Sequence, residues 1–264
     1  MSENESQETI KPSDSYVRSF ARGLEVIKSF SKDRRQQTLT DVAEASGLTR
    51  AGARRILLTL VELGYAEIDG RMFRLTPKIL DLGYAYLSSM PLGDVAEPVV
   101  EALVRKVSES SSIAMLDGND IVYVLRVPTR QIMTLNLSIG SRLPAALTSM
   151  GRVLLSGLDD KALDAHLKAF LSRNYPSAQP VTLETLRASI ELVRKQGWAM
   201  VRQELETGLI SMAAPIRDRN HRIIAAINIS SIAEGEESVQ RLTSFLPLLL
   251  ETAEHISQNV EKRV

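Results

Sequence analysis

Apolar positions between residues 38 and 64 recur three and four apart, in two short runs that a polar turn separates. In the first run, Thr38 and Asp41 have the spacing of a capping box, and the apolar residues behind them fall on one helical face. The second run begins after Thr49, a favourable N-cap residue, and continues to Gly64. Its apolar positions are Ala53, Ile56, Leu57, Leu60, Val61 and Leu63. The pattern predicts two short helices joined by a tight turn.

Two runs typical of strands follow these helices. Residues 65–68 and 72–75 flank Asp69 and Gly70, and an Asp-Gly pair in that position is a strong signal for a two-residue hairpin turn. Upstream, Ser19 is a suitable N-cap for a further helix that would pack behind the other two. Its apolar stripe is Phe20, Leu24, Ile27 and Phe30. Helices, turn and hairpin in this order predict a winged helix-turn-helix domain over residues 16–75.

Charge is distributed unevenly in this part of the chain, although the whole sequence is neutral. Residues 16–75 carry eleven basic and seven acidic residues, an excess of four positive charges. In the second helix no acidic residue precedes Glu62, so the arginines at its start have no partner on that helix. Arginine matches phosphate oxygens and guanine edges, and small residues let a helix approach the major groove closely. We therefore expect the second helix to read DNA.

The candidate DNA-binding residues lie at the starts of the two helices and in the hairpin. They are Thr38, Thr49, Arg50, Ala51, Arg54, Arg55, Arg71 and Arg74. The alternative is a small helical packing module with a solvated arginine face, because charged residues on helices usually face water. The one-sided charge and the order of the elements favour DNA binding. One small module buries limited area on DNA, so we expect a homodimer, or a dimer of dimers, on double-stranded operator DNA.

A helix that is apolar nearly all round is predicted after the hairpin. Thr76 and Pro77 place an N-cap before a proline in the first turn, and the run ends before Pro91. Its apolar residues are Ile79, Leu80, Leu82, Tyr84, Ala85 and Leu87. Such a helix needs several partners, so we expect residues 76–90 to link two domains and to contact a second subunit. The alternative is an extra helix of the first domain.

Residues 91–264 alternate between helical and strand patterns. A helix is expected at 94–107, and a hairpin of strands 112–116 and 121–127 follows it. Further strands are expected at 132–137, 198–201, 211–216 and 223–229, and further helices at 183–197 and 237–260. Antiparallel strands flanked by helices on one or both faces predict an α+β fold.

The length and composition agree with this organisation. A chain of 264 residues is long enough for two domains that each bury a core. The absence of cysteine excludes disulfides, thiolate catalysis and cysteine-rich metal sites, and suits a reducing cytoplasm. No apolar run is long enough to span a bilayer, and the polar residues 1–15 cannot be a signal peptide. We expect a disordered tail at 1–15 and a soluble cytoplasmic protein without membrane contacts.

Several blocks of sequence carry a resemblance to a known family. The winged helix followed by LPAALTSMGRVLLSGL (143–158), QELETGLISMAAPI (203–216) and IIAAINIS (223–230) resembles IclR-type transcriptional regulators. More narrowly, YVRSFARGLEVI, LTRAGARRILLTLVELGY, LDGNDIVYVLRVPTR and TSMGRVLL are similar to the group that controls aromatic-acid breakdown through the β-ketoadipate pathway. The resemblance runs from about residue 16 to the last helix.

The resemblance implies that residues 91–264 form a GAF-like α/β effector-binding domain, which holds a small organic or aromatic acid near Thr148. The pocket positions of the family, matched block by block, are Ala145, Thr148, Val201, Leu209, Ser211, Asn228 and Ser230. Thr148 precedes a helix whose N-terminus offers backbone donors for a carboxylate. Alternatively, small polar residues on the inner side of a sheet only satisfy one another. Arg202 and Ile210 depart from the group, which often has an acidic and a basic residue there, so the exact ligand stays open.

Motifs for catalysis are absent from the sequence. It has no serine elbow, phosphate loop or dinucleotide fingerprint, and His166, His221 and His255 are isolated. We therefore expect no catalytic residue, no metal site and no cofactor. A regulator that binds DNA and senses a metabolite fits best. The alternatives are an allosteric enzyme that acts on a small aromatic acid and carries a DNA-binding domain, and a protein-interaction module.

Overall fold

The computed structural model describes residues 15–89, 92–129, 137–173, 175, 180–233 and 235–261. The chain divides into two compact units, Met1–Tyr86 and Leu87–Val264, and the division falls within the segment expected to link two domains. Nearly all of the tail expected at 1–15 and of the strand expected at 132–137 lies outside the described residues.

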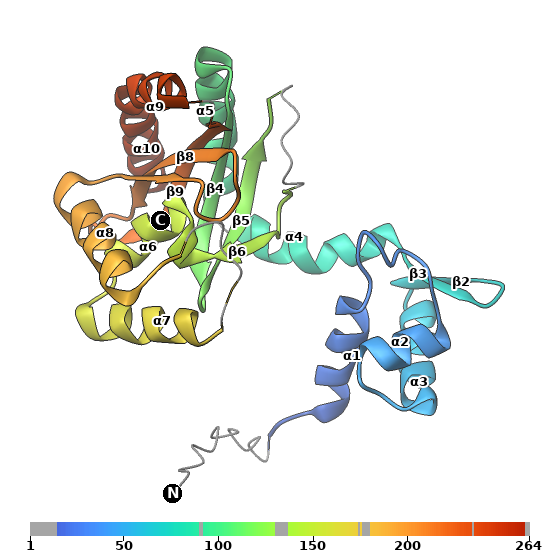
Figure 1. Cartoon of the computed structure of the whole chain (residues 1–264). Coiled ribbons are helices and arrows are strands. Elements are labelled where there is room, and N and C mark those ends of the chain that lie inside the picture. The colour runs from blue at the N-terminus through green and yellow to red at the C-terminus, as the bar shows by residue number, and fades with distance from the viewer. Residues whose placement is uncertain are drawn as a thin grey trace, which may run out of the picture. The chain divides into compact units, whose positions relative to one another are not determined.

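The first unit combines short helices with a small antiparallel sheet (Figure 1). Its elements are α1 (Arg18–Lys28), β1 (Gln37–Thr38), α2 (Leu39–Ala45), α3 (Arg50–Glu62), β2 (Ala66–Asp69) and β3 (Met72–Leu75). In the sheet, β3 lies between β1 and β2. Val26 of α1, Val42 of α2, Leu57 of α3 and Phe73 of β3 belong to one buried core. The predicted helix-turn-helix and wing are therefore confirmed.

Side-chain caps define the two central helices as the sequence predicts. The Thr38 hydroxyl accepts a hydrogen bond from the Asp41 backbone N–H at 3.3 Å, and the Asp41 carboxylate accepts one from the Thr38 N–H at 2.9 Å. The Thr38 N–H and the Thr38 hydroxyl both donate to the Asp41 carboxylate, and these two bonds lower the pKa of Asp41. The Thr49 hydroxyl accepts from the Gly52 N–H at 3.2 Å. Gly64 ends the turn after α3 with a φ of +81°, which a residue with a side chain rarely adopts.

Four details of the first unit differ from the expectation. Ser19 lies inside α1, which begins after Val17 without a side-chain cap. Phe20 is 69% and Leu24 is 39% exposed, and the buried residue of α1 is Val26, which lies outside the expected stripe. Asp69 pairs with Met72, and the two turn residues are consequently Gly70 and Arg71. The short β1, which pairs with β3, was not predicted because two residues carry no readable alternation.

The helix predicted from residue 76 begins as a 3-10 turn, η1 (Pro77–Ile79), and continues as α4 (Leu80–Ser89). Thr76 precedes the turn, but its hydroxyl donates to the Gly64 carbonyl at 2.6 Å instead of capping the helix. Thr76 therefore ties the start of this segment to the end of α3.

In the second unit, six strands among the described residues form an antiparallel sheet in the order β6-β5-β4-β9-β8-β7. They are β4 (Ser110–Asp117), β5 (Asp120–Val127), β6 (Arg142–Pro144), β7 (Ala199–Arg202), β8 (Leu209–Arg217) and β9 (Ile223–Ile232). Helices cover both faces, in agreement with the expected α+β fold (Figure 1). They are α5 (Leu92–Val107), α6 (Ser149–Ser156), α7 (Asp160–Ser172), α8 (Leu183–Gln196), α9 (Gly235–Ser244) and α10 (Leu246–Glu261), with the 3-10 turn η2 (Ala145–Leu147) before α6.

Alternation along the strands separates the two cores of this unit. Met212 and Ile227 belong to the core shared with α5, α9 and α10. Their neighbours Ala213 and Ala226 belong to the core shared with α6, α7 and α8. The small side chains are on the face that α6 covers, so this helix can lie close to the sheet.

The structure corrects two predictions in the second unit. The single helix expected at 237–260 is two helices, α9 and α10, because Phe245 interrupts it and Pro247 has no N–H for a helix that continues from α9. Helix α7, capped by the Asp159 carboxylate, was not predicted. The hairpin of β4 and β5, and α8 with Gly197 in the left-handed conformation at its end, match their predictions.

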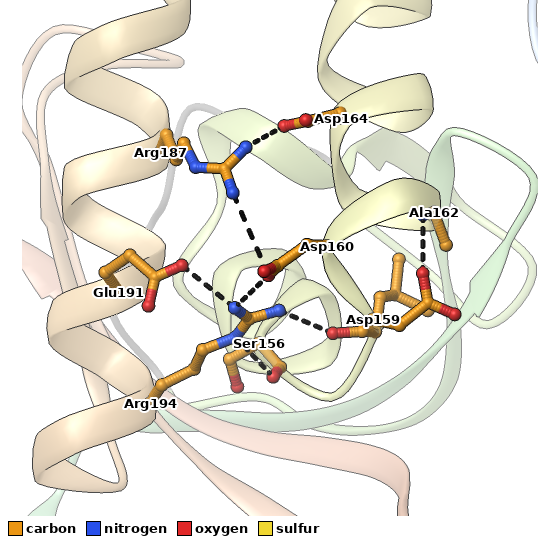
Figure 2. Close-up of polar contacts among 9 residues, drawn as sticks. Ser156, Asp159, Asp160, Ala162, Asp164, Arg187, Glu191 and Arg194 are labelled. Atoms are coloured by element: carbon orange, nitrogen blue, oxygen red, sulfur yellow. Dashed lines mark hydrogen bonds and ion pairs between the residues drawn. The ribbon is translucent and has the colours of Figure 1, made fainter.

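Two arginines of α8 join it to the neighbouring helices (Figure 2). Arg194 donates to the Ser156 carbonyl at the end of α6 at 3.1 Å and to the Asp160 carboxylate of α7 at 2.7 Å. The bond from Arg194 lowers the pKa of Asp160. Arg187 bonds to Asp164 of α7. These contacts fix the C-terminal end of α6, and the N-terminal end of the same helix borders the cavity described next.

Candidate functional site

A cavity lies between the N-terminus of α6, the edge of the sheet at β7 and the loop between β7 and β8. Its volume, traced by the centre of a water-sized sphere, is about 30 Å³. The lining residues are Tyr123, Leu137, Leu143, Leu147, Thr148, Ser149, Met150, Val201, Gln203, Glu204, Leu205, Glu206, Leu209, Ser211, Asn228 and Ser230. Half of these residues are apolar or aromatic, and the other half carry hydroxyl, amide or carboxylate groups, so the cavity offers both apolar contacts and polar groups to a small organic molecule.

Six of the seven positions matched to the family's pocket line this cavity: Thr148, Val201, Leu209, Ser211, Asn228 and Ser230. Strand register brings three of them into one row, because Ser211 pairs with both Val201 and Ser230. Ala145 does not line the cavity. It is fully buried in η2, behind the first turn of α6. Arg202, next to Val201, points away from the cavity and pairs with Glu236 at 2.5 Å.

Several of these polar side chains already have partners. The Thr148 hydroxyl accepts from the Gly151 N–H at 3.0 Å and so caps α6. The Ser211 hydroxyl shares a hydrogen bond of 2.8 Å with the Ser149 hydroxyl. The side-chain oxygen Oδ1 of Asn228 accepts from the Ser112 N–H at 2.9 Å. The NH₂ group of the same side-chain amide is left as the free donor. The first N–H groups of α6, at Ser149 and Met150, have no acceptor within the helix.

The turn before α6 requires glycine at position 151. A Cβ atom added to Gly151 would lie 2.0 Å from the Ala145 carbonyl oxygen and 2.4 Å from the Ala145 Cα. Both neighbours are backbone atoms, so they cannot rotate away. Gly151 therefore allows η2 and the first turn of α6 to pack against each other and to form one wall of the cavity.

Sequence reasoning did not assign the charged and phenolic groups of the cavity. Glu204 and Glu206 line it, and Arg152 of α6, 6% exposed, pairs with Glu204. Burial raises the pKa of Tyr123 to about 12, so its hydroxyl stays protonated at neutral pH. The QELE block contains both acids, but acidic residues in a loop between strands look like a solvated turn. The signal in the sequence that could have identified this charged pair was Arg152, a cation among the apolar residues of a buried helix.

Most of the candidate DNA-binding residues are exposed. Arg50, Ala51, Arg54 and Arg55 are exposed on α3, and Arg71 is exposed in the turn between β2 and β3. None of these arginines has a carboxylate partner among the described residues. Three other candidates have roles in the fold. The hydroxyls of Thr38 and Thr49 cap α2 and α3, and the Arg74 side chain pairs with Glu67 at 2.5 Å.

The histidines do not gather into a site. His166 is buried on α7, where burial lowers its pKa, and His255 is exposed on α10. In the described part of the chain, no group of three or more His, Cys, Asp or Glu side chains could hold a metal ion. No described helix combines the length and apolar character needed to traverse a membrane.

Comparisons with known proteins cover both units. The family model "IclR helix-turn-helix domain" matches residues 19–70, and "Bacterial transcriptional regulator IclR C-terminal" matches residues 84–258. The Pca regulon regulatory protein of Pseudomonas putida is 42% identical over 89% of this chain and 81% of its own length.

Two solved structures are also similar. A transcriptional regulator of Rhodococcus sp. RHA1 is 49% identical, with a TM-score of 0.82 over 93% of this chain and 98% of its own. An IclR homolog of Microbacterium hydrocarbonoxydans, complexed with 4-hydroxybenzoate, is 25% identical, with a TM-score of 0.75. The match covers 92% of this chain and 98% of the homolog.

We expect Gly151→Ala to destabilise the second unit by about 1 to 3 kcal/mol, because the new methyl group overlaps backbone atoms of Ala145. Thermal unfolding followed by circular dichroism measures the effect. Gly23→Ala is the matched control, since a Cβ there meets nothing within 4 Å and alanine favours the helix. Equal melting temperatures for the Gly151→Ala variant and the unmodified chain would contradict the close approach of η2 and α6.

Proposed function

Because the chain belongs to the IclR family of bacterial transcriptional regulators, we propose that α3 reads operator DNA while the cavity beside α6 binds a small aromatic acid. The family consists of transcriptional regulators, so we reject the alternative of an allosteric enzyme that acts on a small aromatic acid. A regulator of this kind binds chromosomal DNA, and we propose that it acts in the cytoplasm.

The proposal for DNA rests on the exposed, unpaired arginines of α3. Arg50, Arg54 and Arg55 can reach bases and phosphates, and Ala51 leaves room for the helix to enter the major groove. Arg71 in the wing is suited to a phosphate contact. Arg74 must first release Glu67, so we expect a smaller contribution from it. Thr38 and Thr49 contribute through the helix starts that they cap, where backbone N–H groups can meet phosphates.

Arg54→Ala and Arg55→Ala should each weaken operator binding by about 1 to 3 kcal/mol where the arginine reads a base, with relaxed preference at one position. A phosphate contact would instead weaken binding to all sequences and reduce its salt dependence. Fluorescence anisotropy on operator and scrambled DNA at several salt concentrations separates the two. Arg105→Ala, which removes an exposed arginine of the second unit, is the control. Wild-type affinity in both α3 variants would contradict the assignment.

A homodimer, or a dimer of dimers, is proposed through α4. Leu80 and Tyr84 on this helix are 70% and 68% exposed, and Leu82 and Tyr86 are more than half exposed. A helix with so much apolar surface in water favours association with another apolar surface. Two copies of α3 would then bind two half-sites, which raises both the affinity and the specificity of a small reading head.

The double substitution Leu80→Glu and Tyr84→Glu should lower the mass observed by sedimentation, because charged side chains oppose burial of this surface. Operator binding should fall more than non-specific binding, since only the former needs two heads. Leu192→Glu changes a similarly exposed leucine on α8 and is the control. An unchanged mass in the double variant would mean that α4 is not the subunit contact.

The proposal for an aromatic acid rests on the composition of the cavity. Leu143, Leu147, Val201 and Leu209 supply apolar contacts for a ring. The NH₂ group of Asn228, the hydroxyls on the neighbouring strands and the first N–H groups of α6 supply donors for a carboxylate. The bound 4-hydroxybenzoate of the Microbacterium hydrocarbonoxydans homolog and the Pca regulon protein of Pseudomonas putida support this chemical class. The ligand regulates if it binds one arrangement of the reading heads better than another.

Ser211→Ala and Asn228→Ala should weaken binding of 4-hydroxybenzoate about tenfold to a hundredfold, because each removes a hydrogen bond to a charged group. Calorimetry of the full chain measures this, with operator affinity in the absence of ligand expected to stay unchanged. Ser238→Ala, a buried serine on α9 outside the cavity, is the control. Full ligand affinity in both cavity variants would move the binding site elsewhere.

A further inference from the structure

The cavity lies next to a buried ion pair. Arg152 of α6 follows the capping residue Thr148 by one helical turn. Its Nε donates to the Ala146 carbonyl at 3.1 Å, and its Nη2 bonds to the carboxylate of Glu204. Glu204 itself lines the cavity, so the guanidinium group is one hydrogen bond away from the space where a ligand would lie.

Among the residues that the structure describes, those that line the cavity directly include two carboxylates, Glu204 and Glu206, and no lysine, arginine or histidine. An acid that enters would bring a further negative charge close to both. Like charges a few ångströms apart in a partly buried site repel strongly, and the repulsion is screened less than at a surface. Arg152 is one nearby cation that can offset this, but it already has a carboxylate partner. Arg126 also lies near Tyr123 of the cavity and donates to the Ser112 hydroxyl at 3.3 Å.

The loop that carries Glu204 is closed on itself. The Gln203 N–H donates to the Leu209 carbonyl at 2.7 Å, and the Gln203 side-chain oxygen accepts from the Gly208 N–H at 3.0 Å. Gln203 and Gly208 both have positive φ, at 55° and 82°. These bonds brace the loop that places Glu204 at the cavity wall, beside Arg152.

We propose that Glu204 sets the charge selectivity of the cavity by competing with the carboxylate of the ligand for Arg152. This rests on the proposed function, because it takes the cavity as the binding site for an aromatic acid. In the free protein Glu204 neutralises the buried guanidinium group, whose burial without a partner would be costly. A ligand carboxylate gains Arg152 only at the expense of that pair. Glu204 therefore weakens the binding of acids relative to neutral molecules of the same shape.

The test compares 4-hydroxybenzoate with the neutral 4-hydroxybenzamide, which has the same ring and hydroxyl group. Calorimetry of the full chain gives the ratio of the two affinities. In Glu204→Gln the amide oxygen still accepts from Arg152, but the competing charge is gone. The acid should then bind about tenfold to a hundredfold more tightly, while binding of the amide changes by less than about threefold.

Two further variants define the mechanism. Glu206→Gln removes the other lining carboxylate, which has no ion pair with Arg152, and should favour the acid by a much smaller factor. The double variant Arg152→Met and Glu204→Gln removes both charges, a replacement that proteins often tolerate at buried ion pairs. It should lose the tighter binding of the acid that Glu204→Gln alone produces. Should Glu204→Gln fail to fold, the double variant still decides. The ratio of its affinity for the acid to its affinity for the amide must not exceed the ratio measured for the unmodified chain.

Other outcomes contradict the proposal. If Glu204→Gln weakens both compounds equally, Glu204 only supports the fold of the loop. If it weakens the acid alone, Glu204 orients Arg152 for the ligand instead of competing with it. Binding of both compounds with an unchanged ratio contradicts only the role of Glu204. Absence of acid binding in every variant, Glu204→Gln included, contradicts the proposed function as well.

Discussion

The second unit depends on the close approach of α6 to the sheet and to the turn before it. Every residue from Ser149 to Leu155 is buried, so the helix is enclosed on all sides. This is possible because Ala114, Ala213 and Ala226 present small side chains to it and because Gly151 leaves room for the Ala145 backbone. At its other end, Arg194 bonds to the last turn. The position of α6 is thus set by contacts along its whole length, and protein interiors tolerate little change in such packing.

That position determines the chemistry of the cavity. Thr148 caps α6 at the wall of the cavity, where Ser149 and Met150 also lie, and Ser149 bonds across to Ser211 on β8. One turn further along, the same helix carries Arg152 to the loop that holds Glu204. Polar groups from the helix, the sheet and the loop therefore meet around an apolar space. A molecule with a ring and a charged group matches this arrangement better than a purely apolar one does.

The first unit follows a simpler principle, because local sequence specifies most of it. The Thr38 and Thr49 hydroxyls accept hydrogen bonds from free backbone N–H groups at the starts of α2 and α3. Gly64 adopts a positive φ, which lets the chain turn directly after α3. The buried residues of α3 alternate with exposed arginines, so a single helix both completes a small core and presents positive charge to the solvent. The division of tasks between a reading head and a cavity in a separate unit is that of an IclR regulator.

The sequence by itself determined the features that depend on neighbours in the chain: the capping box, helix α3 with its Thr49 cap, the β4 and β5 hairpin, and the end of α8 at Gly197. Capping and periodicity act over a few residues and are readable without a structure. Family blocks also selected six residues that line the cavity. Only the tertiary structure decided that Ala145 lies behind Gly151, that Arg74 pairs with Glu67, and that Arg152 meets Glu204. Arg152 and Glu204 are 52 residues apart, and their pairing follows from strand register and helix packing, which no local pattern encodes.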